Sequence, residues 1–187
     1  MSLTHSSMLP LNTIAPPFKL LETVSGKLAS LQELRGKRGT VIVFMCNHCP
    51  FVKHIQKELV RIANTYQAQD VSFIAISAND VENYPEDAPE KMKLVAEKLG
   101  YPFPFLYDET QSVAKAYHAA CTPDLFLFDS ELKCVYRGQL DDSRPGNNIP
   151  VTGHDLCHAL DNLLAHQPID PNQKPSMGCN IKWKSEF

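Results

Sequence analysis

Cysteine is the residue type whose spacing in this sequence could do chemistry. The segment Cys46-Asn47-His48-Cys49 places two thiols three positions apart. Thiols at this spacing can close a small disulfide and reopen it by exchange, in which a thiolate attacks a disulfide sulfur. The chain holds four more cysteines, which are Cys121, Cys134, Cys157 and Cys179. Dithiol redox chemistry is therefore the first hypothesis, and the elements around the pair must position it.

The pair lies between a predicted strand and a predicted helix. The apolar, β-branched run Thr40–Met45 is typical of a strand that is buried on both faces. A helical pattern follows, with apolar residues three and four positions apart from Phe51 to Ala63. We expect Cys46 in the first helical turn, where unpaired amide groups and the helix dipole stabilise a thiolate. Cys46 is then the nucleophile, and Cys49, one turn deeper, is the resolving thiol.

His48 lies between the two thiols and is the candidate for tuning them. A partly protonated imidazole would favour the thiolate at Cys46 and make the disulfide more oxidising. The alternative is a solvent-exposed histidine of little influence. The pair could also be half of a zinc site, but no second Cys-X-X-Cys segment occurs and only His54 offers a nearby ligand. We therefore expect no metal and no cofactor.

A proline before a predicted strand is the second candidate element. Cys121-Thr122-Pro123 directly precedes a strand that begins at Asp124, and a proline that opens a strand removes no ladder hydrogen bond. From the local sequence, Pro123 is a turn proline. A cis bond between Thr122 and Pro123 would be a rarer feature that exposes the Thr122 backbone for pairing with a substrate chain.

The other cysteines have weaker claims to redox chemistry. Cys121, beside the Thr-Pro turn, is either a third redox thiol or, as we expect, a small buried residue. Cys179 lies in the C-terminal tail and is by default a covered structural thiol. A mobile tail thiol could instead resolve an oxidised Cys46 or link to another chain. We expect no redox role for Cys134 and Cys157.

Composition and charge limit the class of protein. The 187 residues fit one domain, and 43% hydrophobic with 21% charged residues is ordinary for a soluble globular protein. A formal charge of −3 lacks the basic surface of a nucleic-acid binder. No apolar run approaches the roughly 18 residues of a membrane span, and the first ten residues do not resemble a secretory signal. We therefore expect a cytoplasmic protein with reduced thiols that binds neither nucleic acid nor membranes.

Strands and helices alternate along most of the chain. A hairpin around Ser25-Gly26 precedes the strand that leads to Cys46. Asp87 and Glu90 resemble a capping box, which opens a helix that ends at Gly100. The remaining predicted elements are strands at 71–77, 103–107, 124–129 and 134–140, a short helix at 113–118, and a last helix that is capped by Thr152 and Asp155 and extends to Leu164.

This order of elements predicts an α/β fold with a mixed central sheet flanked by helices. The alternating part gives parallel strands, and the last hairpin adds antiparallel ones. The fold begins with the N-terminal β-hairpin, while residues 1–15 are polar and expected to be loose. We predict one domain, in which residues 12–166 form the body and residues 167–187 form an extended C-terminal tail.

The order strand, Cys-X-X-Cys, helix and a distant Thr-Pro before the final hairpin resembles the thioredoxin superfamily. Ala15-Pro16-Pro17-Phe18 resembles the opening of its redoxin branch, which includes the alkyl-hydroperoxide-reductase/thiol-specific-antioxidant (AhpC/TSA) group and the TlpA-like reductases. Segments 44–50, 76–80, 102–108 and 141–147 resemble this branch and a bacterial subgroup of redoxin-domain proteins. The resemblance covers about residues 12 to 185. It implies a thioredoxin fold with Pro123 in cis beside Cys46 and Cys49.

Three positions depart from the patterns of these families. Met45 stands where thioredoxins usually carry a tryptophan, which puts thioredoxin-like partner recognition in doubt. Val43 stands where typical peroxiredoxins carry a threonine that helps to orient the peroxide, which weakens a peroxidase role. Val52 stands where some TlpA-like reductases carry a carboxylate.

The cysteine pair and the resemblance support three functional hypotheses. The first is a thiol–disulfide oxidoreductase whose partner is a disulfide-containing protein or a small thiol or disulfide. The second is a peroxiredoxin-like thiol peroxidase, in which Cys46 forms a sulfenic acid and Cys49 closes on it. The third is a metal-binding or redox-sensing protein without catalysis. The sequence leaves open the physiological substrate and the choice between a monomer and a homo-oligomer.

Overall fold

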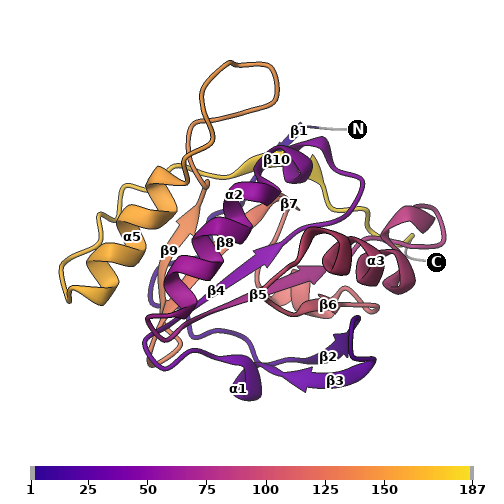
Figure 1. Cartoon of the computed structure of the whole chain (residues 1–187), viewed down its shortest axis with the longest axis horizontal. Helices are drawn as coiled ribbons and strands as arrows, with labels where there is room; N and C mark the ends of the chain where they lie inside the picture. The colour runs from indigo at the N-terminus through magenta and orange to yellow at the C-terminus, as the bar shows by residue number, and fades with distance from the viewer. Residues whose placement is uncertain (1–2, 186–187) are drawn as a thin grey trace.

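A mixed β-sheet crosses the centre of the molecule, and helices cover both of its faces (Figure 1). The computed structural model describes residues 3–185. Within them, the main sheet has the strand order β3-β2-β6-β5-β4-β8-β9. Its strands are β2 (Lys19–Glu22), β3 (Lys27–Ser30), β4 (Gly39–Phe44), β5 (Val71–Ser77), β6 (Phe105–Tyr107), β8 (Asp124–Asp129) and β9 (Cys134–Gly138). The β4–β5 and β5–β6 pairs are parallel and the others antiparallel, so the predicted mixed sheet and its N-terminal hairpin are confirmed.

β4 is the central strand that carries the cysteine pair at its end. It pairs with β5 on one side and with β8 on the other, and all six of its residues are buried. Val41 and Val43 pack into the core on one face of the sheet, whereas Ile42 and Phe44 pack into the core on the other. Burial on both faces explains why this strand is continuously apolar rather than alternating.

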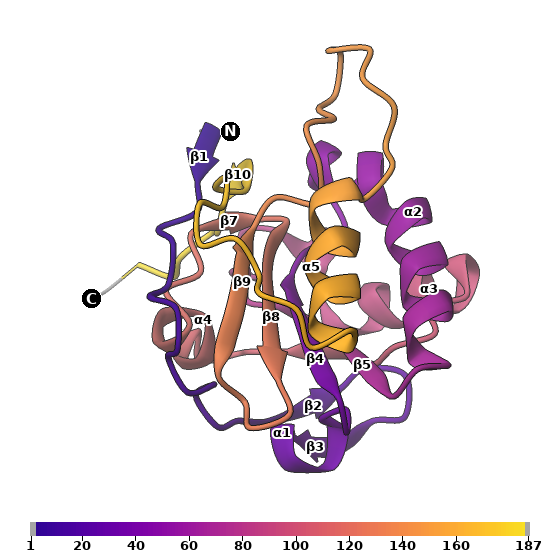
Figure 2. The ribbon, with the colours of Figure 1, turned by 90° about the vertical axis from the view of Figure 1, so that its left-hand side faces the viewer.

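Helices divide between the two faces of the sheet (Figure 2). The core on one face contains side chains of α2 (Pro50–Gln67), α3 (Pro89–Leu99) and α5 (His154–Leu164). The core on the other face contains side chains of α1 (Leu31–Leu34) and α4 (Ser112–Ala116). Among residues 3–185, no helix combines the length and the apolar character that crossing a membrane requires.

The two ends of the chain meet in a small second sheet. Within the described residues its order is β1-β10-β7, formed by β1 (Leu3–His5), β10 (Met177–Asn180) and β7 (Cys121–Thr122). The expectation of a loose N-terminal segment is therefore wrong for β1, because its backbone pairs with β10. The tail is also more than an extended segment, since β10 pairs on both of its edges.

The predicted capping box at the start of α3 is wrong. The N-cap is Ala88, and Asp87 ends a short 3₁₀ helix, η1 (Pro85–Asp87). The Asp87 carboxylate turns away from α3 and accepts hydrogen bonds from residues near the cysteine pair. The predicted end of α3 at Gly100 is confirmed, with Gly100 in the left-handed region at a φ of 61°.

The start of α5 also differs from the prediction. Its N-cap residue is Gly153, and Asp155 lies inside the helix, but the hydroxyl of Thr152 does accept the amide of His154, the first residue of α5, at 3.3 Å. A Cβ atom at Gly153 would lie 2.2 Å from Cδ1 of Ile62, so the contact between α5 and α2 requires glycine there. The carboxylate of Asp141 accepts the amides of Thr152 and Gly153, each at 2.7 Å, and this holds the preceding loop against the helix.

Candidate active site

The two thiols lie in the loop between β4 and α2. α2 begins at Pro50, so Cys49 is its N-cap residue and Cys46 lies before the helix, outside the first turn predicted from the sequence. The amides of Asn47 and His48 bond to the Asp87 carboxylate at 2.8 and 3.2 Å, which holds this segment outside the helix. The positive end of the helix dipole therefore lies at Cys49 rather than at Cys46.

Cys49 is the thiol whose surroundings favour the charged form. It is fully buried, and as a thiol it donates to the Thr122 carbonyl at 3.1 Å. A hydrogen bond with Cys46 lowers the pKa of Cys49 to about 4, against the opposing effect of burial, and bonds from Cys179 and from the Val52 amide add to this lowering. The thiolate of the pair is therefore held on Cys49.

Cys46 has the opposite electrostatic environment. Its Sγ lies 3.6 Å from Oγ1 of Thr122 and 3.9 Å from Nδ1 of His48, and the residue is 1% exposed. The hydrogen bond with Cys49 raises the pKa of Cys46, and burial and the negative charge of Asp87 raise it further. This direction is opposite to the thiolate that the sequence predicted at Cys46. The reason is the interaction of Cys46 with Cys49, together with its burial and the Asp87 carboxylate beside it.

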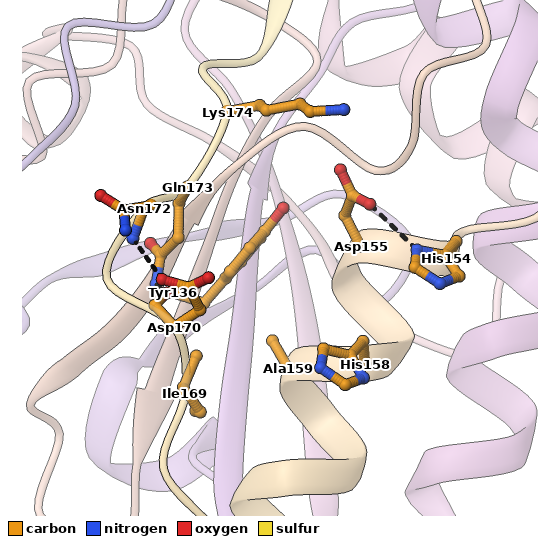
Figure 3. A pocket seen from close by; sticks show the side chains of 10 residues that line it. All are labelled: Tyr136, His154, Asp155, His158, Ala159, Ile169, Asp170, Asn172, Gln173 and Lys174. Atoms are coloured by element: carbon orange, nitrogen blue, oxygen red, sulfur yellow. Dashed lines mark hydrogen bonds and ion pairs between the residues drawn. The ribbon is translucent and has the colours of Figure 1, made fainter.

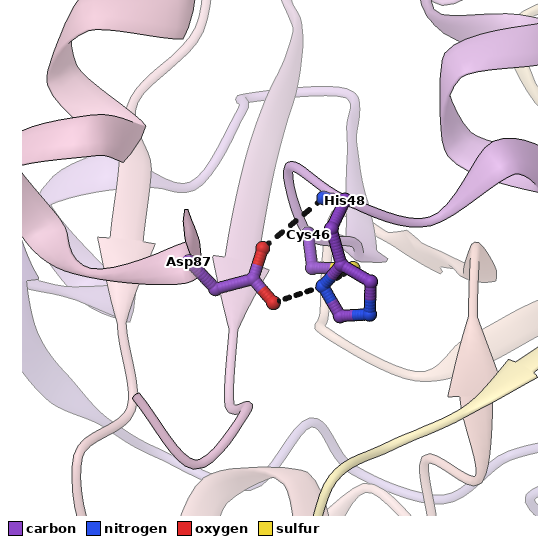
Figure 4. Close-up of side chains that lie close together, drawn as sticks. All are labelled: Cys46, His48 and Asp87. Carbon is purple, nitrogen blue, oxygen red and sulfur yellow. Dashed lines mark hydrogen bonds and ion pairs between the residues drawn. The ribbon is translucent and has the colours of Figure 1, made fainter. Parts of the chain in front are cut away.

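The ring of His48 lies closer to Asp87 than to Cys46. In Figure 4 dashed lines join the Asp87 carboxylate to the backbone amide and to the ring of His48, with Nδ1 2.5 Å from Oδ2 of Asp87. The ring also stacks on Tyr84, at 5.4 Å between ring centroids. Asp87 is fully buried, and Asn79 donates to Oδ2 at 2.8 Å as well. No local sequence signal predicts this role for Asp87, which lies 39 positions from His48.

These side chains also form a three-residue group of metal-ligating type. The ligand atoms of Cys46, His48 and Asp87 all lie within 4.8 Å of one another. A closed zinc site needs four ligands, and the oxygens of Asp87 already accept four N–H donors. His54, the further ligand suggested by the sequence, contacts Oγ of Ser143 at 2.6 Å instead. The group is therefore better suited to positioning the loop than to binding zinc.

The peptide bond between Thr122 and Pro123 is cis, as the resemblance implied. Thr122 approaches both thiols, with its hydroxyl near Cys46 and its carbonyl bonded to Cys49. The backbone of Thr122 is not open to a substrate chain in this structure, because Cys179 of β10 is its strand partner. A Cβ at Gly178 would lie 2.0 Å from the Thr122 carbonyl oxygen, so β10 approaches this edge only because Gly178 has no side chain.

The remaining cysteines lie in structural positions. Cys121 is buried in β7, where its thiol bonds to the Pro123 carbonyl at 3.6 Å and burial raises its pKa. Cys134 is buried in β9, and Cys157 is half-buried on α5. Cys179 differs from these three, since its Sγ lies 3.0 Å from Sγ of Cys49.

A cavity beside α5 does not belong to this site. Figure 3 shows it between α5 and the tail segment 169–174, with a volume of about 180 Å³ and His154 and His158 on its helical side. Its lining residues include no cysteine. A smaller hollow is lined by Pro123, His54 and Arg144 and therefore adjoins the cis proline.

The fold and the paired thiols define a thioredoxin-like redoxin. Residues 11–137 match the family model described as the AhpC/TSA family, and the chain therefore belongs to that family. No curated protein matches the chain. A protein from Geobacillus kaustophilus, described as an uncharacterized conserved protein, is 60% identical, with a TM-score of 0.98 over 100% of this chain and 99% of that one. A hypothetical protein from Sinorhizobium meliloti 1021 is 43% identical, with a TM-score of 0.95 over 98% and 100% of the two chains.

The thioredoxin-like fold extends to more distant structures. A thiol:disulfide interchange protein of the thioredoxin family from Chlorobium tepidum is 16% identical, with a TM-score of 0.63 over 84% of this chain and 99% of that one. At this identity the likeness shows the fold alone. The thioredoxin fold implied by the sequence motifs is thus confirmed.

Proposed function

We propose that this redoxin is a thiol–disulfide oxidoreductase in which Cys46 and Cys49 cycle between dithiol and disulfide. One observation carries the proposal. The two thiols lie at the end of a buried strand, close enough for each to shift the pKa of the other, and Thr122, beside a cis proline, contacts both. This arrangement gives a thiolate at neutral pH with a second thiol in reach, which disulfide exchange requires.

The pKa shifts of the pair suggest which reaction step each thiol performs. Cys46 attacks one sulfur of a substrate disulfide, and its proton passes along the shared hydrogen bond to the Cys49 thiolate. One substrate sulfur becomes bonded to Cys46, and the other leaves as a thiolate. Cys49 then attacks Cys46 in this mixed disulfide, passes its proton to the departing substrate sulfur, and closes the Cys46–Cys49 disulfide.

Strand β10 covers the backbone edge of Thr122, and this affects which substrates can reach the thiols. A protein substrate that pairs with this backbone must first displace β10, whereas a small disulfide only needs access to Cys46. We therefore propose a small thiol or disulfide as the first partner to test, with a disulfide-containing protein as the alternative. The proposed location is the cytoplasm, whose thiol pools would return the pair to the dithiol.

Turnover by single-cysteine variants tests the proposal. The reduction of glutathione disulfide by dithiothreitol is measured with and without the protein. Cys46→Ser abolishes the acceleration, and Cys49→Ser leaves a mixed disulfide on Cys46 that mass spectrometry detects. Cys134→Ser, which alters a buried thiol in β9 away from the pair, serves as the control and keeps full turnover. Full turnover in both Cys46→Ser and Cys49→Ser would reject the mechanism.

A thiol peroxidase is the second candidate, and one contact favours it. The sequence lacks the expected hydroxyl at Val43, but Oγ1 of Thr122 lies 3.6 Å from Sγ of Cys46 and could orient a hydroperoxide in its place. A hydroperoxide is also small enough to enter a site whose thiols are almost fully covered. Rapid consumption of hydrogen peroxide that depends on Cys46 and Thr122 supports this reaction, and consumption no faster than that of a simple thiol rejects it.

A further inference from the structure

Strand β10 brings a third thiol to the cysteine pair. Sγ of Cys179 lies 3.0 Å from Sγ of Cys49, about 1 Å more than the roughly 2.05 Å length of a disulfide bond. We propose that Cys179 is a second resolving thiol, which takes the disulfide over from Cys46 by exchange at Cys49. The proposal rests on the Cys46–Cys49 cycle and adds a step to it.

Cys179 is held in place from both ends of β10. Before it, the hydroxyl of Ser176 donates to the Pro123 carbonyl at 2.6 Å. After it, the amide of Lys182 donates to the side-chain oxygen of Asn79 at 2.9 Å. Cys179 is 3% exposed, so its thiol faces the interior rather than solvent. It is therefore a positioned thiol and not the mobile tail thiol that the sequence alone allowed.

The exchange step balances without a further reagent. The Cys179 thiol loses its proton and attacks Sγ of Cys49 within the Cys46–Cys49 disulfide. A Cys49–Cys179 bond forms, the Cys46–Cys49 bond breaks, and Cys46 leaves as a thiolate that takes up the proton. One disulfide replaces another, so the oxidant that formed the first disulfide suffices. Cys46 becomes a thiol again, while the chain retains one disulfide, which now joins Cys49 to Cys179.

The position of Cys49 favours exchange over metal binding by the three thiols. Sγ of Cys49 lies 3.0 Å from Sγ of Cys179, and Cys49 also interacts with Cys46, the other member of the pair. Within residues 3–185, the metal-ligating group whose atoms all lie within 4.8 Å of one another consists of Cys46, His48 and Asp87, and Cys179 is not part of it. A central sulfur with two neighbours is the arrangement that thiol–disulfide exchange needs, because the attacked sulfur must contact both the entering and the leaving sulfur.

Disulfide mapping of the full-length protein tests the proposal. The protein is treated with glutathione disulfide, quenched in acid, alkylated and digested with trypsin. Cys46 and Cys49 then lie in peptide 39–53 and Cys179 lies in peptide 138–182, because trypsin does not cut before Pro145 and Pro175. Peptide 138–182 also contains Cys157, so all proteins compared carry Cys157→Ser. A cross-link between the two peptides then reports a bond to Cys179.

Each variant has a distinct expected outcome. The parent protein forms the cross-link, and Cys46→Ser, which leaves β10 unaltered, forms it as well. Cys179→Ser forms only the Cys46–Cys49 disulfide, and the amount of alkylatable Cys46 in the oxidised protein falls about tenfold, since exchange no longer releases it. Cys121→Ser, a buried thiol in the adjacent strand β7, is the matched control and behaves like the parent.

The outcomes separate this proposal from the proposed function. If Cys46–Cys49 forms but neither the parent nor Cys46→Ser gives the cross-link, the role of Cys179 is rejected and the two-thiol cycle stands. If Cys179→Ser cannot form the Cys46–Cys49 disulfide although it is folded, the cycle is rejected, and the exchange with it. Gly178→Ala adds a check that retains Cys179. Its Cβ would clash with the Thr122 carbonyl, so the cross-link decreases while Cys46–Cys49 remains.

Discussion

The carboxylate of Asp87 bonds to Nδ1 of His48 at 2.5 Å and thereby fixes the ring beside Cys46. It also accepts the amides of Asn47 and His48, so one buried side chain holds the whole segment between the two thiols. With Nδ1 turned to Asp87, Nε2 is buried without a hydrogen-bond partner among residues 3–185. Asp87 thus positions His48 and places a negative charge beside Cys46.

Removing the charge of Asp87 should make Cys46 more reactive. Asp87→Asn keeps an oxygen for the amides but removes the negative charge that contributes to the raised pKa of Cys46. If that pKa falls by about half to one unit, alkylation of Cys46 by iodoacetamide near neutral pH becomes roughly threefold to tenfold faster. The rate is measured by mass spectrometry of peptide 39–53. Glu86→Gln, at an exposed neighbouring position, should leave the rate unchanged, and an equal rate in Asp87→Asn would refute the electrostatic role.

The thiolate on Cys49 should persist to acidic pH. A hydrogen bond from Cys46 lowers the pKa of Cys49 to about 4, so the ultraviolet absorbance of one thiolate should be present at neutral pH and disappear as the pH falls through about 4. Because the two thiols are coupled, this transition belongs to the pair. Cys46→Ala removes the donor and should move the transition upward, whereas Cys49→Ser should remove it. A wild-type transition near pH 9 would contradict the assignment.

Asp124 should make stability depend on pH. Burial raises the pKa of this carboxyl to about 7 in the folded protein, and its Oδ1 has no hydrogen-bond partner within residues 3–185. A raised folded pKa means that the folded state binds more protons than the unfolded state between pH 3.8 and about 7. Stability due to this group is therefore complete below the unfolded value and is lost as the pH rises through the folded one.

Asp124→Asn removes this titration and tests its sign. The Asn variant should be more stable than the wild type above pH 7. Its advantage in the free energy of unfolding should grow by about 2–3 kcal/mol between pH 5 and pH 8. Urea unfolding of both proteins at the two pH values measures the difference. An advantage that is the same at pH 5 and pH 8 would show that Asp124 does not titrate in this range.

The sequence predicted those parts of the site that depend on local signals. The buried run of β4, the Cys-X-X-Cys segment after it and the proline before β8 lie where expected, because each signal comes from neighbouring residues. The role of Asp87 could not be predicted in this way. Its spacing to Glu90 satisfies a local capping pattern, but in the folded chain the carboxylate bonds to His48 instead.

The position of β10 could not be predicted from local sequence signals either. Met177-Gly178-Cys179-Asn180 is short and contains a glycine, which weakens a strand prediction. The strand forms because β1 and β7 flank it, and both pairings join segments far apart in the chain. The sequence could therefore name Cys179 as a candidate thiol, whereas its contact with Cys49 rather than Cys46 is a tertiary property.

A redox titration of the wild-type protein in glutathione buffers tests the proposed cycle most directly. Alkylation and mass mapping at each glutathione ratio report which cysteines have paired. The Cys179→Ser variant is measured alongside, because in it the Cys46–Cys49 disulfide forms without the subsequent exchange with Cys179. We expect a Cys46–Cys49 disulfide in Cys179→Ser that forms reversibly at a potential between about −120 and −270 mV, the range of thioredoxin-fold oxidoreductases. If that disulfide does not form in the folded protein at any ratio of the buffer, the Cys46–Cys49 cycle is wrong.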